Sequence, residues 1–140
     1  MTSLISSYTK LPSLFFKDQN PEKVPHPDLL FFNHELAREL NFEASSLSDE
    51  DLANIFSGNR LLENTRPIAL AYAGHQFGHF VPQLGDGRAL LIAEMNNRDV
   101  QLKGSGRTFF SRRGDGKSAL GPVVREYIVS EAMHALGIPT

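Results

Sequence analysis

Residues 71–140 read AYAGHQFGHFVPQLGDGRALLIAEMNNRDVQLKGSGRTFFSRRGDGKSALGPVVREYIVSEAMHALGIPT. The stretch places three glycine-rich turns, GDGR, GSGR and RRGDG, around a lysine in a predicted strand, and then a predicted helix with a glutamate. Glycine amides and clustered cations are the groups that bind a polyphosphate. The first half of the chain contains no comparable pattern, so this stretch decides the fold and the function that we predict.

Two antiparallel strands are predicted inside the stretch. Residues 88–94 (RALLIAE) form a strand with an apolar centre, and residues 99–103 (DVQLK) form the second strand after a turn at 96–98. Residues 104–116 read as a long loop rich in glycine and arginine. Lys103 lies at the end of the second strand, on the face opposite to Leu102.

Helices are predicted on both sides of these strands, which makes the fold class α+β. Residues 1–28 contain four prolines and are predicted to run extended along a surface. The predicted helices begin at Asp28 (to residue 40), at the capping box of Ser48 (to about 56), at Pro67 (short, to 74) and at Gly121 or Pro122 (to about 136).

The chain divides at residue 70 into an N-terminal extended and helical region, 1–70, and a region 71–140 that carries the phosphate-binding signals. A ribbon of two strands is marginally stable without further strands. We therefore expect region 71–140 to be incomplete at its C-terminal end, and the chain to be the N-terminal part of a longer protein. Phe15, Phe16, Phe31 and Phe32 are expected in the core.

Composition excludes several classes of protein. The 140 residues have a net charge of −2 and no cysteine, which excludes disulfides and thiolate metal sites. No apolar run is long enough to span a membrane, and the N-terminus does not resemble a secretory signal. We expect a soluble cytoplasmic protein with neither a membrane nor a nucleic acid as partner.

The charge is unevenly distributed, with a group of cations in the second half of the chain. Acidic residues concentrate earlier, between residues 43 and 51. A local cationic patch on a mildly acidic protein favours a small anion over a nucleic acid backbone. The cations are Arg98, Lys103, Arg107, Arg112, Arg113, Lys117 and Arg125.

Lys103 has two possible interpretations. It is either a solvated lysine on the polar face of a strand, or a phosphate contact that projects into a cleft beside Gly104 and Gly106. Glu126 favours the second interpretation, because a strand lysine held by a helix glutamate organises the nucleotide site of kinase-like folds. In isolation, Glu126 is equally compatible with an exposed helix position beside Arg125.

The glycine turns also allow two interpretations. Gly85 and Gly87 either form a tight turn, or present amides to a phosphate with Arg88 adding charge. Asp115 is either a turn aspartate that binds its own backbone, which is the more frequent case, or an acceptor for a ribose or an adenine amine. No turn matches the P-loop or the dinucleotide-binding motif. Arg112 and Arg113 are either phosphate ligands or solvated arginines.

His75 and His79 are four residues apart, as in helical metal sites. The neighbouring glycines disfavour a helix, and no glutamate stands where a zinc protease has its base. We therefore expect packed or hydrogen-bonded histidines and no metal site in this chain. No nucleophile elbow is present either, so nothing supports a hydrolase triad.

Four long strings in the chain are similar to the selenoprotein O family, whose members are kinase-like protein adenylyltransferases. The strings are YAGHQFGHFVPQLGDGRALL, QLKGSGRT, SRRGDGK and REYIVSEAMHALGIPT. They cover about half of the chain, and the remainder resembles the N-terminal region of the family more loosely. One difference is Thr108-Phe109-Phe110-Ser111, where the family usually has threonine-proline-tyrosine-serine.

The resemblance implies a protein-kinase-like N-terminal lobe that binds ATP and Mg²⁺ and transfers AMP to serine, threonine or tyrosine hydroxyls of proteins. Matched by position, Glu126 pairs with Lys103. The catalytic aspartate and the magnesium ligands of the family are expected beyond Thr140, so that this chain alone is expected to be inactive. The implied nucleotide contacts are Gly85, Gly87, Arg88, Lys103, Asp115 and Gly116.

Two other hypotheses remain open. One is a pseudokinase-like module that binds a nucleotide or a protein without catalysis. The other is an RNA- or anion-binding protein that uses the arginine cluster, which predicts a steep salt dependence without nucleotide selectivity.

Overall fold

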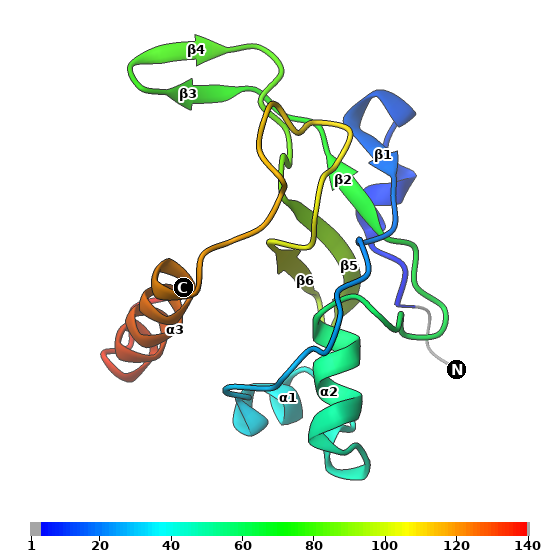
Figure 1. Cartoon of the computed structure of the whole chain (residues 1–140), viewed down its shortest axis with the longest axis vertical. Coiled ribbons are helices and arrows are strands. Elements are labelled where there is room, and N and C mark those ends of the chain that lie inside the picture. Colours follow the sequence, from blue (N-terminus) through cyan, green and yellow to red (C-terminus); the bar gives the residue numbers. More distant parts are fainter. Residues whose placement is uncertain (1–3, 140) are drawn as a thin grey trace.

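A four-stranded antiparallel sheet forms the centre of the computed structural model, which describes residues 4–139 (Figure 1). The strand order is β1 (Phe16–Asp18), β2 (Ile68–Leu70), β5 (Ala89–Met95) and β6 (Arg98–Lys103). A separate hairpin of β3 (Gly74–Gln76) and β4 (His79–Val81) projects from the sheet. The predicted α+β class with an antiparallel sheet is confirmed.

The β5–β6 hairpin forms where the sequence predicted it. Asn96 and Asn97 make its tight turn with φ angles of 48° and 60°, in the left-handed region that asparagine tolerates. Along β5, Leu90 and Leu91 are almost completely buried, at 1% and 0% exposure. A strand with both faces covered reads as a continuous apolar run, which is why RALLIAE lacks alternation.

The helix predicted at residues 67–74 is wrong. Residues Ile68–Leu70 instead form β2, which pairs with β1 on one side and with β5 on the other. The first strand, β1, lies inside the region predicted as extended chain, and Asp18 forms an ion pair of 2.6 Å with Arg66 beside it. Strands from both sides of residue 70 therefore share one sheet, and the sheet has four strands where two were predicted.

The helix predicted from residue 28 is shorter than expected. Helix α1 covers only His34–Glu39, because the Asn33 side chain accepts a hydrogen bond from the Leu36 amide and caps the helix there. Helix α2 (Asp49–Phe56) starts with the predicted capping box at Ser48, and α3 (Leu120–Ala135) lies close to its predicted bounds. Single 3-10 turns occupy Ser7–Lys10, Ser13–Phe15 and Ala44–Ser46.

Only part of the predicted aromatic core is buried. Phe16 of β1 is buried and packs with Ile68 of β2 and Leu91 of β5. Phe32 packs in a second cluster around Leu52, between α1 and α2. The expectation is wrong for Phe15 and Phe31, which remain exposed, although Phe31 stacks on Tyr127 of α3 with ring centroids 5.6 Å apart. Tyr127 is one of several exposed apolar residues of α3, a helix in which no residue is buried.

Within residues 4–139, no helix has both the length and the apolar character needed to cross a membrane.

Candidate functional site

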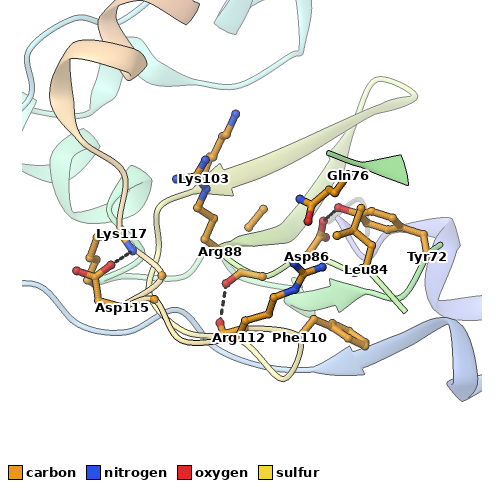
Figure 2. Close-up of a pocket in the computed structure, with 16 residues that line it drawn as sticks. Tyr72, Gln76, Leu84, Asp86, Arg88, Lys103, Phe110, Arg112, Asp115 and Lys117 are labelled. Atoms are coloured by element: carbon orange, nitrogen blue, oxygen red, sulfur yellow. Dashed lines mark hydrogen bonds between the residues drawn. The ribbon is translucent and has the colours of Figure 1, made fainter. Parts of the chain in front are cut away.

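A cleft of about 610 Å³ opens beside the sheet, between the glycine turn before β5 and the loop after β6 (Figure 2). Its volume lies in the range of small-molecule and cofactor sites. The walls come from the β2–β3 region, the turn 84–89, the end of β6 and the loop 111–117. The lining residues are Tyr72, Gln76, Leu84, Gly85, Asp86, Gly87, Arg88, Ala89, Lys103, Phe110, Ser111, Arg112, Gly114, Asp115, Gly116 and Lys117.

Lys103 reaches the cleft from the last position of β6 and contacts helix α3. Its Nζ lies 2.8 Å from Oε1 and 2.9 Å from Oε2 of Glu126. The hydrogen bond from Lys103, its charge, and the charges of Arg88 and Arg125 lower the pKa of Glu126. Both side chains are at least half exposed. The ammonium therefore keeps access to the cleft while the carboxylate fixes its direction.

The glycine turn at residues 85–87 is held by its central aspartate. The Asp86 carboxylate accepts hydrogen bonds from the Tyr72 hydroxyl (3.0 Å) and from the Leu70 amide (3.1 Å). Burial raises the pKa of Asp86, and these hydrogen bonds oppose the shift. Because the carboxylate points back toward β2, the turn offers its backbone rather than this side chain to the cleft.

Gly85 is required by packing. Its φ is +58°, and a Cβ atom there would lie 2.4 Å from Cγ of Phe110, which is buried beneath the turn. Gly87 differs, because a Cβ atom would come no closer than 3.4 Å to the Phe110 carbonyl oxygen. The fold therefore accommodates a methyl group at Gly87 but not at Gly85, and Gly87 is the better probe of a ligand that approaches the backbone.

The loop of residues 104–117, here called the cleft loop, is fastened to the glycine turn by two hydroxyl groups. Thr108 Oγ1 donates to the Asp86 carbonyl, and Ser111 Oγ donates to the Gly87 carbonyl at 2.6 Å. Ser111 Oγ also accepts from the Thr108 amide at 2.8 Å. Residues 108–111 are thus ordered by their hydroxyls, with phenylalanine where the similar family usually has proline and tyrosine.

Asp115 and Gly116 close the cleft loop on the side of α3. The Lys117 amide donates to Oδ1 of Asp115 at 2.9 Å, which is the turn geometry that short acidic side chains favour. The Gly106 amide donates to the Gly116 carbonyl at 3.2 Å, so the two ends of the loop cross there. Asp115 therefore has the turn geometry of the first interpretation and also lines the cleft, while its role as an acceptor for a ribose or an adenine amine stays a prediction.

The predicted cations divide into two groups. Lys103, Arg112 and Lys117 line the cleft, and Arg88 joins them from the glycine turn. Arg107, Arg113 and Arg125 are not among its lining residues, and the Arg107 Nε donates to the Gly114 carbonyl at 3.0 Å. Arg98 lies at the far end of β6, in a different depression beside α1.

His75 and His79 lie on the two strands of the projecting hairpin. The register pairs His75 with Phe80, and their ring centroids are 5.4 Å apart. Within the described part of the chain, no group of three or more histidine, cysteine, aspartate or glutamate side chains is arranged to hold a metal ion.

Several residues that shape the cleft were missed in the sequence. Asp86 lies inside the GDGR string, but only Gly85, Gly87 and Arg88 of that string were assigned a role. Tyr72 gave no signal, because its partner is a carboxylate 14 residues away in a turn. Gln19 and Glu22 were hidden in a proline-rich segment whose contacts with the cleft loop are more than 80 residues distant in the sequence.

We predict an alkaline loss of stability that depends on Tyr72. Burial, together with the hydrogen bond to Asp86, raises the pKa of Tyr72 from 10 to about 12. Because the Tyr72 hydroxyl holds its proton more tightly in the folded than in the unfolded protein, it adds to the free energy of unfolding. This contribution is complete below pH 10 and is lost as pH rises toward about 12. The free energy of unfolding of wild type minus that of Tyr72→Phe, from urea titrations, should therefore shrink across this window. A constant difference would contradict the prediction.

The chemistry that this arrangement supports is the binding of an extended anion. Arg88, Lys103 and Arg112 line one cleft together with two stretches of glycine backbone, and the Lys103 ammonium is held in place by a carboxylate. The Lys117 ammonium is directed to Glu22 instead. Such groups stabilise charge on transferring phosphoryl groups. The carboxylates of Asp86 and Asp115 already accept hydrogen bonds from the protein.

Comparison with known proteins adds two findings. The family described as Protein adenylyltransferase SelO matches residues 2–140. Proteins named protein nucleotidyltransferase YdiU are similar over nearly the whole chain: one from Rhizobium rhizogenes is 61% identical over 96% of it, and one from Clostridium botulinum is 54% identical over 99%. The chain spans 28% and 29% of the length of these two relatives.

Proposed function

Because the chain belongs to the SelO family of protein adenylyltransferases, we propose that it is the ATP-binding part of an enzyme that transfers AMP to protein hydroxyls. The observation that carries the proposal is the cleft itself. Six residues that the family resemblance implies as nucleotide contacts, far apart in sequence, line one cavity of suitable size. They are Gly85, Gly87, Arg88, Lys103, Asp115 and Gly116.

We further propose that the sheet and α3 form the N-terminal lobe of a protein-kinase-like fold. The ion pair between a strand lysine and a helix glutamate supports this, because it is the arrangement that positions nucleotide phosphates in kinases. The order of the elements, with two antiparallel strands followed by a loop and a helix, agrees with it.

In the proposed reaction, an acceptor hydroxyl oxygen bonds to the α-phosphorus of ATP, the bond from this phosphorus to the bridging oxygen breaks, and pyrophosphate leaves. The hydroxyl proton passes to an aspartate outside this chain. The residues described here bind and orient the nucleotide. Lys103, Arg88 and Arg112 offset the charge of the triphosphate, and backbone amides of the glycine turn add hydrogen bonds.

Among the described residues, the carboxylates of this cleft do not form a cluster that could hold magnesium. Asp86 faces Tyr72 and the Leu70 amide, and one oxygen of Asp115 is bound to the Lys117 amide. We therefore propose that the protein ligands of an ATP-bound magnesium ion lie outside this chain. The same reasoning predicts that the 140 residues alone do not transfer AMP.

A non-catalytic, pseudokinase-like nucleotide-binding module is the second candidate. It is favoured by the orientation of Asp86, whose carboxylate faces Tyr72 and the Leu70 amide, so that Asp115 is the one remaining carboxylate among the described lining residues. The full-length protein that carries this chain distinguishes the two candidates. Transfer of labelled AMP to protein supports the enzyme, and ATP binding without transfer supports the module.

Titration of ATP against the full-length protein tests the proposed binding site. Lys103→Ala should weaken ATP binding by about tenfold to a hundredfold, as expected for loss of a charge-assisted contact. Arg98→Ala is the matched control, because it removes a cation from the other end of the same strand, outside the cleft. Equal affinities of wild type and Lys103→Ala, with and without magnesium, would contradict the role of Lys103.

A further inference from the structure

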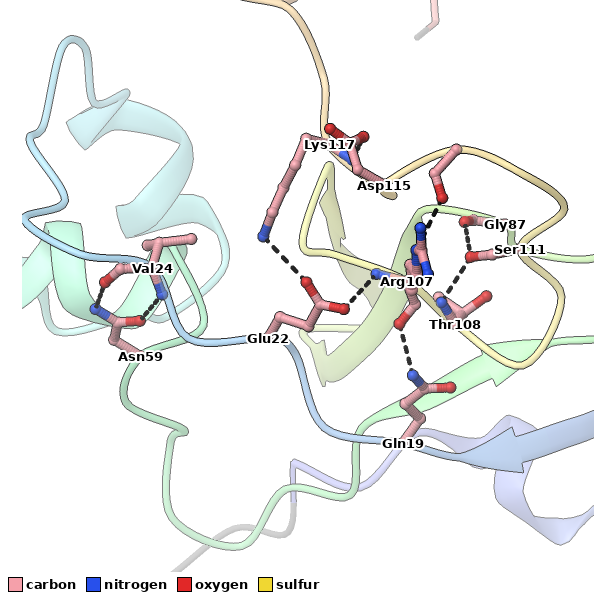
Figure 3. A network of polar contacts seen from close by, with 11 residues as sticks. Gln19, Glu22, Val24, Asn59, Gly87, Arg107, Thr108, Ser111, Asp115 and Lys117 are labelled. Carbon is pink, nitrogen blue, oxygen red and sulfur yellow. Dashed lines mark hydrogen bonds and ion pairs between the residues drawn. The ribbon is translucent and has the colours of Figure 1, made fainter.

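We infer that Gln19 and Glu22 are positioning residues that hold the cleft loop in the shape that binds the nucleotide. They belong to residues 19–24, here called the N-terminal strap, which runs along the outer side of the loop (Figure 3). This inference rests on the proposed function, and it assigns a role to a segment that neither the sequence motifs nor the cleft lining includes.

The strap is fixed at both ends to the body of the protein. At one end, the backbone N–H of Gln19 donates to the Pro67 carbonyl at 3.1 Å, next to β2. At the other end, the Asn59 side chain pairs with both backbone groups of Val24, at 2.9 Å in each direction. Between them, Pro21 packs so closely on Gly58 that a Cβ atom there would lie 2.5 Å from the proline ring. The strap is therefore a firm base for its side chains.

The Gln19 side chain acts toward the cleft loop as a neighbouring strand would. Its Nε2 donates to the Arg107 carbonyl at 2.6 Å, and its Oε1 accepts from the Phe109 amide at 2.8 Å. A primary amide has the same donor and acceptor as a peptide group, so it satisfies both backbone groups at once. These two residues flank Thr108, whose hydroxyl holds the glycine turn.

Glu22 continues the same contact along the loop. Its backbone amide donates to the Ser105 carbonyl at 2.9 Å, and its Oε1 accepts from the Arg107 amide at 3.1 Å. Its other oxygen lies 3.5 Å from Nζ of Lys117, at the end of the loop. The side chain lies across Gly106, where a Cβ atom would be 2.5 Å from it. Glu22 thus joins the start and the end of the cleft loop.

The consequence for the site follows from the order of these contacts. The strap fixes residues 105–109. Thr108 within this segment and Ser111 just after it donate to the carbonyls of the glycine turn, and the end of the loop presents Asp115 and Gly116 to the cleft. Without the strap, the Arg107 and Phe109 backbone groups would lose their protein partners. The loop would then populate other conformations, and ATP would have to select the binding-competent one.

Titration of ATP in the full-length protein, with thermal unfolding measured in parallel, tests this inference. Gln19→Ala and Glu22→Ala should each weaken ATP binding about fivefold to tenfold, the effect of one or two hydrogen bonds. Glu22→Gln keeps an oxygen that accepts from the Arg107 amide and should restore most of the affinity, although it loses the ion pair with Lys117. Hydrogen exchange at residues 105–109 without ATP should be faster in both alanine variants.

Glu63→Ala is the matched control, because Glu63 is exposed and its side chain has no hydrogen bond or ion pair among residues 4–139. It should bind ATP as wild type does. If wild type binds ATP and both alanine variants bind it equally well, the inference is overturned while the proposed function stands. If wild type itself does not bind ATP, the proposed function fails and the inference fails with it. Weaker binding that only follows a lower unfolding temperature, without rescue by Glu22→Gln, also overturns the inference.

Discussion

Replacing Gly116 by alanine is expected to destabilise the cleft loop more than any other single change within it. Gly116 has a φ of +73°, and a Cβ atom would lie 2.0 Å from the carbonyl carbon and oxygen of Gly106 and 2.4 Å from the Arg107 nitrogen. The obstacle is backbone, which cannot rotate away as a side chain can. We expect a loss of at least about 3 kcal/mol in the free energy of unfolding, because the backbone at residue 116 becomes strained and the two loop segments that cross at Gly106 and Gly116 are forced apart.

Gly114→Ala is the control for this experiment. Gly114 lies in the same loop, but the nearest atom to a Cβ there would be 4.0 Å away. Urea unfolding should show a change within about 0.5 kcal/mol, the range of surface substitutions. Equal stability of the two alanine variants would mean that residues 106 and 116 do not cross at this distance.

The second large effect is expected for Leu91→Ala in the centre of β5. Leu91 is fully buried, faces Ile68 across the β2–β5 pair, and packs with Phe16 of β1. Its truncation leaves a cavity at the point where the two N-terminal strands join the hairpin. Loss of about 3 to 4 kcal/mol is expected for a buried leucine in such a site.

Thermal and urea unfolding measure this loss, with Leu14→Ala as the comparison. Leu14 is 72% exposed, so its truncation should change stability little. A small effect of Leu91→Ala, similar to that of Leu14→Ala, would show that β2 does not pack against β5 as described.

The elements that the sequence predicted correctly are those with local causes. The β5–β6 hairpin forms around two asparagines that tolerate a positive φ, and α2 begins at a capping box formed by Ser48 and Asp51. Each of these signals acts between residues a few positions apart. A pattern of neighbouring residues is therefore enough to locate the element.

The elements that the sequence did not predict depend on distant partners. Strand β1 has three residues, and its partner in β2 is about fifty residues away, so neither carries a local pattern that fixes its pairing. Helix α1 is short because Asn33 caps it inside an apolar run that would otherwise continue the helical stripe. In both cases tertiary contacts override local preference.

The candidate site divides in the same way. Glycines and cations stand out in the sequence, and the structure gathers Gly85, Gly87, Arg88 and Lys103 in one cleft with the end of the loop. The supports behind them, such as Tyr72 and Gln19, are ordinary polar residues whose partners are known only once the chain is folded. The nucleotide-binding roles of the glycines and cations are predictions that measurement of ATP affinity tests.

Side-chain contacts join helix α3 to the rest of the protein. Its Glu126 accepts a hydrogen bond from Lys103, and its Glu131 accepts one from the Asn33 side chain. Its Tyr127 stacks on Phe31. An ammonium can donate three hydrogen bonds, and a phosphate that accepts one of them changes the contact between Lys103 and Glu126 that anchors the helix. Linked equilibria are reciprocal. With the nucleotide bound as we propose, a change that it makes in the affinity of α3 for a partner is matched by an equal change that the partner makes in the affinity for the nucleotide.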